Sequence, residues 1–151
     1  PEPDAMIAPL LLALALQTAP HGQHAAPHAA PVHPMVIVRE ADVEVEQSPP
    51  PHDGVGRSTA WRLSDQAPMR NFEFRKRTLH PGASIGLHVL NHDEVYYVVS
   101  GQGEVASDGT TQIIGPETAA YLYEGADVGI KQVGTEPLVL IIAYPLRARV
   151  Q

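Results

Sequence analysis

The sequence contains no cysteine, which excludes disulfide bonds and thiolate metal sites and leaves the redox compartment open. Basic residues are also scarce, because 10 Lys and Arg stand against 17 Asp and Glu and give a formal net charge of −7. The only basic run is 75–77, so neither nucleic acid nor an anionic membrane surface is an expected partner. The longest apolar run, 6–16, is too short to cross a bilayer, and no stable membrane span is expected.

What is present is an ordinary globular composition, with 44% hydrophobic and 18% charged residues over a length that suits one domain. Residues 1–18 resemble the apolar core of a signal peptide, although the usual preceding basic residues are missing. A cleaved leader implies export, periplasmic or secreted, and otherwise the protein is cytoplasmic. Residues 19–34, rich in Ala, Pro and His, indicate an extended linker. A single folded domain is therefore expected over 35–151.

Short apolar segments recur along this domain and are separated by turns that contain Pro or Gly. Many carry β-branched or aromatic residues, and no window outside the leader holds a long amphipathic helical period. The pattern predicts an all-β fold, a sandwich or a barrel. Strands are expected at 36–38, 43–46, 59–63, 71–79, 94–100, 103–107, 111–114, 119–123, 128–133 and 138–143.

Residues 82–103 hold the densest group of side chains that can do chemistry. His88, His92 and Glu94 precede an apolar run, and glycines bracket the whole stretch. Because side chains alternate across a strand, His88, Leu90, His92 and Glu94 share one face if the strand is continuous. A turn at 91–93 would break this alternation at His92. The expected site therefore depends on where the His92 ring lies.

The same stretch resembles the first motif of the cupin superfamily, which is Gly, five residues, His-x-His, three or four residues, Glu, six residues and Gly. Here Gly82 is followed by five residues, His88, Glu94 and six residues to Gly101. The resemblance covers about residues 70–145 and is closest to a small single-domain cupin. It implies a double-stranded β-helix, a jelly-roll barrel, that binds a small molecule inside.

Two of the four family ligand positions are changed. Leu90 replaces the second His of the first motif, and Val128 replaces the His of the second motif. The resemblance then implies a degenerate metal site of His88, His92 and Glu94. A set of two His and one carboxylate can hold Fe, Mn, Ni or Zn with open positions. Asp127, beside Val128, is a further possible substitute ligand.

Three functions stay open. A metal-dependent enzyme would use His88 and Glu94 as catalytic residues around a divalent ion, for isomerase or dioxygenase chemistry. A metal-free enzyme of the sugar epimerase or isomerase type would use His88 or a tyrosine as acid or base. In it, Arg75 or Arg77 would hold a substrate carboxylate or phosphate. A non-catalytic protein would bind a small ligand in a more apolar pocket.

Two further residues are candidate substrate contacts, Tyr96 on the apolar run and Gln132 at the Asn position of the second cupin motif. Purely structural roles compete with all of these assignments. His88 and the tyrosines suit a hydrogen-bonded core, His92 suits a solvated turn, and Glu94 suits an ion pair with the basic run 75–77.

The edge strands of a small jelly roll favour association, because they expose unpaired backbone groups. We therefore expect a homodimer. Residues 35–47 are the natural candidate for a strand added to the partner's sheet.

Overall fold

The computed structural model describes residues 34–147. The predicted leader and most of the predicted linker therefore lie outside the described residues. The chain divides between Pro34 and Met35, and all described helices and strands belong to the unit that begins at Met35. Over 34–147 there is no helix of the length and apolarity needed to cross a bilayer.

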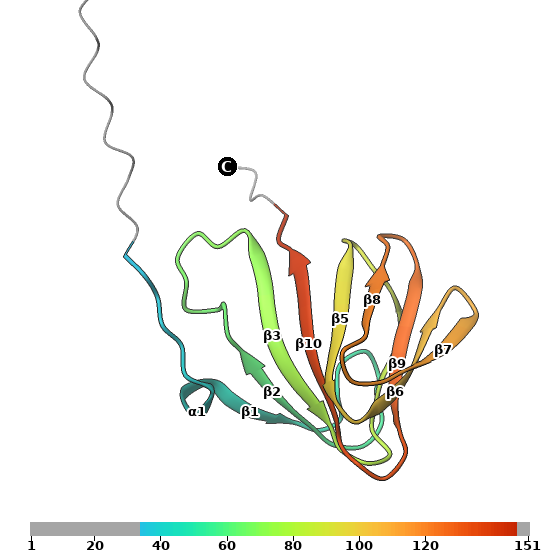
Figure 1. The fold of residues 1–151 in the computed structure, drawn as a ribbon. Coiled ribbons are helices and arrows are strands. Elements are labelled where there is room, and N and C mark those ends of the chain that lie inside the picture. The colour runs from blue at the N-terminus through green and yellow to red at the C-terminus, as the bar shows by residue number, and fades with distance from the viewer. Residues whose placement is uncertain (1–33, 148–151) are drawn as a thin grey trace, which may run out of the picture. The chain divides into compact units, whose positions relative to one another are not determined.

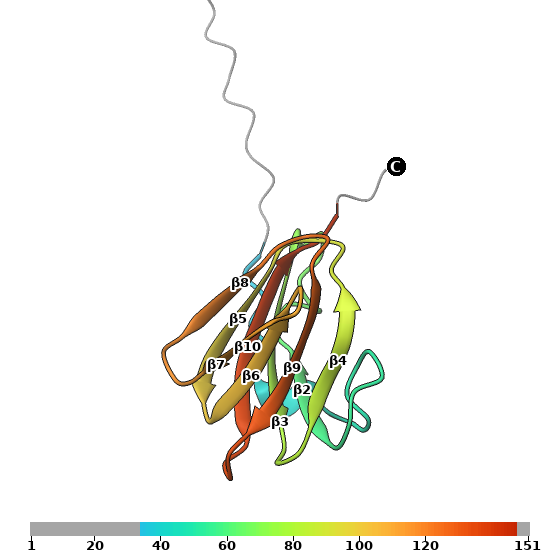
Figure 2. The ribbon, with the colours of Figure 1, turned by 90° about the vertical axis from the view of Figure 1, so that its right-hand side faces the viewer.

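The fold consists of two antiparallel sheets (Figures 1 and 2). The first sheet has the strand order β1-β2-β3-β10-β5-β8, and the second has the order β4-β9-β6-β7. A single helical turn, α1 (Glu40–Val43), precedes the first strand. The strands are β1 (Glu44–Gln47), β2 (Ser58–Arg62), β3 (Phe72–Leu79), β4 (Ser84–Val89), β5 (Glu94–Ser100), β6 (Gln102–Ser107), β7 (Thr110–Ile114), β8 (Ala119–Leu122), β9 (Asp127–Val133) and β10 (Leu138–Pro145).

The last strand lies in the middle of the first sheet, where it joins distant parts of the chain. β10 pairs with β3 on one side, with Leu140 opposite Arg77, and with β5 on the other, with Ile142 opposite Tyr96. Figure 1 shows β3, β10 and β5 side by side in this order. The fold is therefore an all-β jelly roll, as the sequence predicts.

The hydrophobic core lies between the two sheets. Leu79, Val98 and Leu140 of the first sheet and Ile85 and Val128 of the second are among its buried members. Such apolar burial is worth about 25 cal/mol per Å² and supplies most of the drive to fold. Val128 is fully buried, so the side chain at this family ligand position serves the core.

The N-terminal segment differs from the prediction in two respects. Residues 36–38 form no strand, and Met35 and Ile37 are exposed. An apolar run becomes a strand only where its backbone finds a partner, and no described strand lies beside it. β1 pairs with β2 of its own chain, with Val45 opposite Ala60. The predicted homodimer stays a prediction, but residues 44–47 are already used within the chain.

Two strand features position the candidate site. The odd-numbered side chains of β3 face the interior of the fold: Glu73, Arg75, Arg77 and Leu79. Three of these four are charged, and charged side chains are rarely buried. In β4 the pairing with β9 is interrupted between Ile85 and His88. Such a bulge re-aims the side chains that follow it.

Candidate ligand-binding site

A cavity of about 250 Å³ lies within the jelly roll. Its walls come from β3, β4, β5, β10 and the loop that follows β1. Six of the seven residues singled out from the sequence line it: Arg75, Arg77, His88, His92, Glu94 and Tyr96. The fold therefore gathers residues from three separate strands, and from the turn before β5, at one place.

Arg77 is the buried cation of this cavity, with only 2% of its surface exposed. Its Nη1 donates to Ser58 Oγ at 2.7 Å and its Nη2 donates to Gln47 Oε1 at 2.9 Å. Both acceptors are neutral, and within residues 34–147 no carboxylate forms an ion pair with Arg77. Burial, and then the charge of Arg75, lower the pKa of Arg77 to about 10. The cavity wall therefore carries an uncompensated positive charge.

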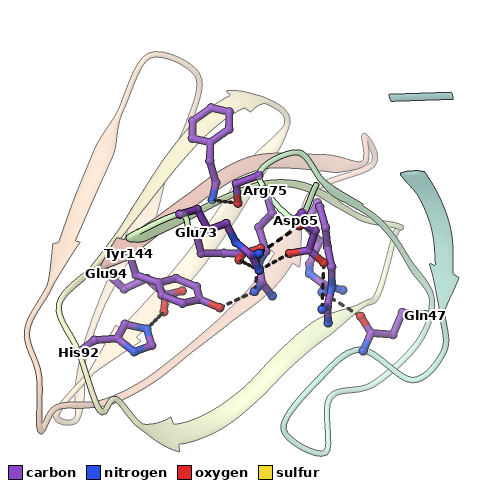
Figure 3. Close-up of polar contacts among 12 residues, drawn as sticks. Gln47, Asp65, Glu73, Arg75, His92, Glu94 and Tyr144 are labelled. Carbon is purple, nitrogen blue, oxygen red and sulfur yellow. Dashed lines mark hydrogen bonds and ion pairs between the residues drawn. The ribbon is translucent and has the colours of Figure 1, made fainter. Parts of the chain in front are cut away.

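Arg75, in contrast, belongs to a balanced chain of charges (Figure 3). Its Nη2 lies 3.2 Å from Glu73 Oε1, and the other Glu73 oxygen lies 3.4 Å from Nη2 of Arg70. Arg70 in turn pairs with Asp65 at 2.7 Å. Arg75 also donates a hydrogen bond to the Tyr144 hydroxyl. Its charge is thus offset by buried Glu73, whereas that of Arg77 is not.

The His92 ring, whose position the sequence leaves open, lies at the cavity and is hydrogen-bonded to Glu94. Its Nε2 is 3.1 Å from Glu94 Oε2, and since an ionised carboxylate only accepts, Nε2 is the donor. The ring stacks on Tyr144 with the centroids 4.0 Å apart. Figure 3 shows His92, Glu94 and Tyr144 grouped at one end of the polar network. Glu94 is 7% exposed and pairs with His92 instead of the basic run.

The tautomer of His88 is set by a hydrogen bond between its ring and the backbone of β4. Its Nδ1 lies 2.9 Å from the carbonyl oxygen of Gly86, and a carbonyl cannot donate, so Nδ1 carries the hydrogen. In the neutral ring Nε2 then holds the lone pair and is the acceptor. The imidazole is held from the other side by the His52 ring, which is stacked on it at 3.5 Å and nearly parallel.

His52 belongs to the loop segment 50–56, which crosses β4. Gly86 N donates to Pro51 O at 3.4 Å, and Ser84 N donates to Val55 O at 2.9 Å. A Cβ at Gly86 would lie 1.8 Å from the His52 carbonyl oxygen, so only glycine allows this approach. Partial burial, and then the charges of His88 and Arg77, lower the pKa of His52.

Tyr96 closes the inner wall of the cavity. It is 1% exposed, and burial, reinforced by the nearby Glu94 carboxylate, raises the pKa of its hydroxyl well above 10. The hydroxyl therefore stays neutral at physiological pH. It supplies polarity to the cavity without adding charge.

The side chains present do not fit the metal site that the family resemblance implies. In the described part of the chain, no three His, Asp or Glu residues lie together as a group that would hold a metal ion. The Nε2–H of His92 points at Glu94, Leu90 lines the cavity as an apolar residue, and Val128 is in the core. Binding needs several converging ligands. A metal on His88, His92 and Glu94 stays a prediction.

Two candidates from the sequence lie elsewhere. Gln132 does not line the cavity, because its amide is used by the backbone: Oε1 accepts from Gly82 N at 2.8 Å, and Nε2 donates to three carbonyls between 133 and 136. Asp127 is exposed on β9, and its backbone nitrogen donates to Asp108. Gln132 therefore anchors two turns, and Asp127 lines no part of this cavity.

Sequence reasoning missed His52, Tyr144 and the role of Glu73. The alternation of Glu73, Arg75 and Arg77 along one strand was the available signal, because same-parity residues share a face. No local pattern connects His52 to His88, since they meet only through a loop that crosses another strand.

Comparison with known proteins supports the fold. Residues 76–144 match the family model of the cupin domain. No curated protein matches the chain. Among solved structures, a predicted oxalate decarboxylase from Thermotoga maritima is 25% identical, with 74% of this chain and 99% of that chain covered and a TM-score of 0.66.

Two other structures show the same fold at lower identity. The polyketide cyclase RemF from Streptomyces resistomycificus is 21% identical, with coverage of 74% and 79% and a TM-score of 0.62. An RmlC-like cupin from Shewanella frigidimarina is 20% identical, with coverage of 78% and 95% and a TM-score of 0.61. The family match, the jelly-roll topology and the motif from Gly82 to Gly101 together identify residues 76–144 as a cupin domain.

Proposed function

We propose that this cupin binds a small carboxylate in its cavity through protein side chains alone. The observation that carries the proposal is Arg77, a buried guanidinium on the cavity wall with no carboxylate partner over 34–147. A buried charge without a counter-ion costs several kcal/mol in real proteins. An anionic ligand would remove this cost, and the planar guanidinium suits a carboxylate in shape and charge.

The size of the cavity limits the ligand to a small metabolite. Its volume of about 250 Å³ is below the range of roughly 300–1,000 Å³ that is usual for drug-sized ligands. A small carboxylate fits this limit better than a sugar phosphate or a nucleotide. The Thermotoga maritima structure supports the same class, because oxalate is a small dicarboxylate.

A second candidate function is a proton-transfer enzyme of the isomerase or epimerase type. It is favoured by the acceptor nitrogen of His88, which is fixed by Gly86. Such an acceptor in a cavity is the group that a general base requires. Here His88 would remove a proton from the ligand and return it at another position, because the Nε2–H of His92 is directed at Glu94.

Isothermal titration of the purified protein with acetate, propanoate, oxalate and phosphate tests the binding proposal. We expect the carboxylates to bind and Arg77→Met to abolish their binding. Arg57→Met is the matched control, because Arg57 is exposed and makes only a 3.9 Å contact with Glu46. Equal affinity of the wild type and Arg77→Met would contradict the proposal.

The enzymatic candidate has its own test. Bound carboxylates are incubated in D₂O, and NMR follows the exchange of their C–H protons. Exchange that is lost in His88→Phe supports catalysis. Binding without exchange identifies a non-catalytic carrier.

A further inference from the structure

The hydrogen-bonding groups of the cavity are arranged unevenly, with donors on β3 and acceptors elsewhere. Arg75 and Arg77 line the cavity, and a guanidinium carries donors and no acceptor. This side of the cavity therefore suits a ligand group that only accepts, which a carboxylate does.

The β4 wall offers an acceptor. In the neutral ring, His88 Nε2 holds a lone pair, because Nδ1 carries the hydrogen that is donated to Gly86 O. The Glu94 carboxylate on β5 already accepts from His92 Nε2 and from the Tyr96 hydroxyl. An acceptor on the protein needs a donor on the ligand. A simple carboxylate has no such donor.

From this complementarity, and building on the proposed carboxylate binding, we propose that the ligand is a small 2-hydroxy acid. Its carboxylate lies against Arg75 and Arg77, and its hydroxyl donates to Nε2 of His88. Because both groups must fit in about 250 Å³, the hydroxyl belongs on a carbon close to the carboxylate.

Two related ligand classes fit the cavity less well. A 2-oxo acid carries a carbonyl where the hydroxyl would be, and a carbonyl cannot donate to the acceptor on His88. A 2-amino acid can donate, but its ammonium adds a cation to a cavity whose wall already carries the buried guanidinium of Arg77. Like charges in a poorly solvated space repel strongly. A neutral donor is therefore the better match.

Four nearly isosteric probes test the proposal on the unmodified protein: 2-hydroxypropanoate in both enantiomers, pyruvate, alanine and propanoate. Titration calorimetry, with NMR saturation transfer for weak binders, gives each dissociation constant. We expect one enantiomer of the hydroxy acid to bind about tenfold more tightly than propanoate and pyruvate, since each of these leaves the acceptor nitrogen of His88 without a donor. The methyl ester of the hydroxy acid, which lacks the charge, should not bind.

His88→Phe supplies the matched variant, because it keeps a flat ring against His52 and removes the acceptor nitrogen. In this variant the hydroxy acid and propanoate should bind within about threefold of each other. If propanoate, pyruvate or alanine binds the wild type as tightly as the hydroxy acid, or if the preference survives in His88→Phe, the proposal is wrong. If none of the four acids binds, carboxylate binding itself fails, so the two failures are distinguishable.

Discussion

Replacing Arg77 by Met should abolish carboxylate binding while leaving the protein nearly as stable as before. Met keeps an unbranched side chain of similar length and removes the guanidinium. For most buried charged residues such a change is damaging, because breaking a buried ion pair costs about 3–5 kcal/mol. Arg77 has no such pair in the described chain, so a different result is expected.

The change in the free energy of unfolding on Arg77→Met follows from two opposing contributions. The pKa of Arg77 is lowered from the ordinary arginine value to about 10, so the folded environment disfavours its charge by roughly 3 kcal/mol. The substitution removes this penalty but also the hydrogen bonds to Ser58 and Gln47, each worth about 1.5 kcal/mol at the lower end for a charged donor. The two contributions nearly cancel, and the free energy of unfolding should change by less than about 2 kcal/mol.

The dependence on pH has a definite sign. Arg77 has a lower pKa in the folded state than in the unfolded state, so its penalty is complete below pH of about 10. As the pH rises above about 10 toward the ordinary pKa of arginine, the penalty disappears and the wild type gains stability relative to the variant.

Urea denaturation of both proteins, with and without a carboxylate, is the assay. At a ligand concentration of 100 times the dissociation constant, the wild type should gain about 2.7 kcal/mol and the variant nothing. A loss of more than about 4 kcal/mol in the unliganded variant would show that Arg77 acts as a satisfied structural charge, and would refute the reasoning.

Three further outcomes are expected. Gly86→Ala should lower the free energy of unfolding by about 2 kcal/mol or more and weaken carboxylate binding, because its Cβ would displace the His52 carbonyl. Gly115→Ala is the control, because its Cβ would meet a side-chain carbon at 4.0 Å. In the same urea titration it should change the free energy of unfolding by less than about 0.5 kcal/mol. Tyr144→Phe should keep the stacking on His92 but leave a donor of Arg75 unpaired, so the free energy of unfolding should fall by about 1–2 kcal/mol. An unchanged free energy of unfolding would mean that water replaces the hydroxyl at that donor. EDTA treatment of protein purified without a His-tag should leave carboxylate affinity unchanged within about twofold, and a larger loss together with stoichiometric metal by elemental analysis would restore the predicted site on His88, His92 and Glu94.

Much of the fold could be predicted from the sequence, because the patterns that indicate strands and turns are local in the chain. Alternating and apolar segments between Pro and Gly turns predicted nearly all of the strands to within a few residues. The exception, 36–38, has the composition of a strand but no neighbour to pair with. The cupin motif from Gly82 to Gly101 then limited the topology, and the family match over 76–144 confirms the resemblance.

Only part of the candidate site could be predicted from the sequence. Arg75, Arg77, His88, Glu94 and Tyr96 were expected to be important, and they line one cavity. Their partners were not predictable, because hydrogen bonds between residues far apart in the sequence depend on which strands become neighbours. The position of Gln132 also depended on such contacts, since its amide is used by the turn between β3 and β4 and by the turn between β9 and β10.

The sequence by itself determined the all-β class, the family and the loss of two metal ligands at Leu90 and Val128, because these follow from residue identity and spacing. Only the tertiary structure decided which charges are balanced. Glu73 lies beside Arg75, whereas Arg77, among the described residues, donates to the neutral Ser58 and Gln47. The carbonyl of Gly86 fixes the acceptor nitrogen of His88. Electrostatic compensation depends on distances and burial. Those quantities exist only once the two sheets are packed together.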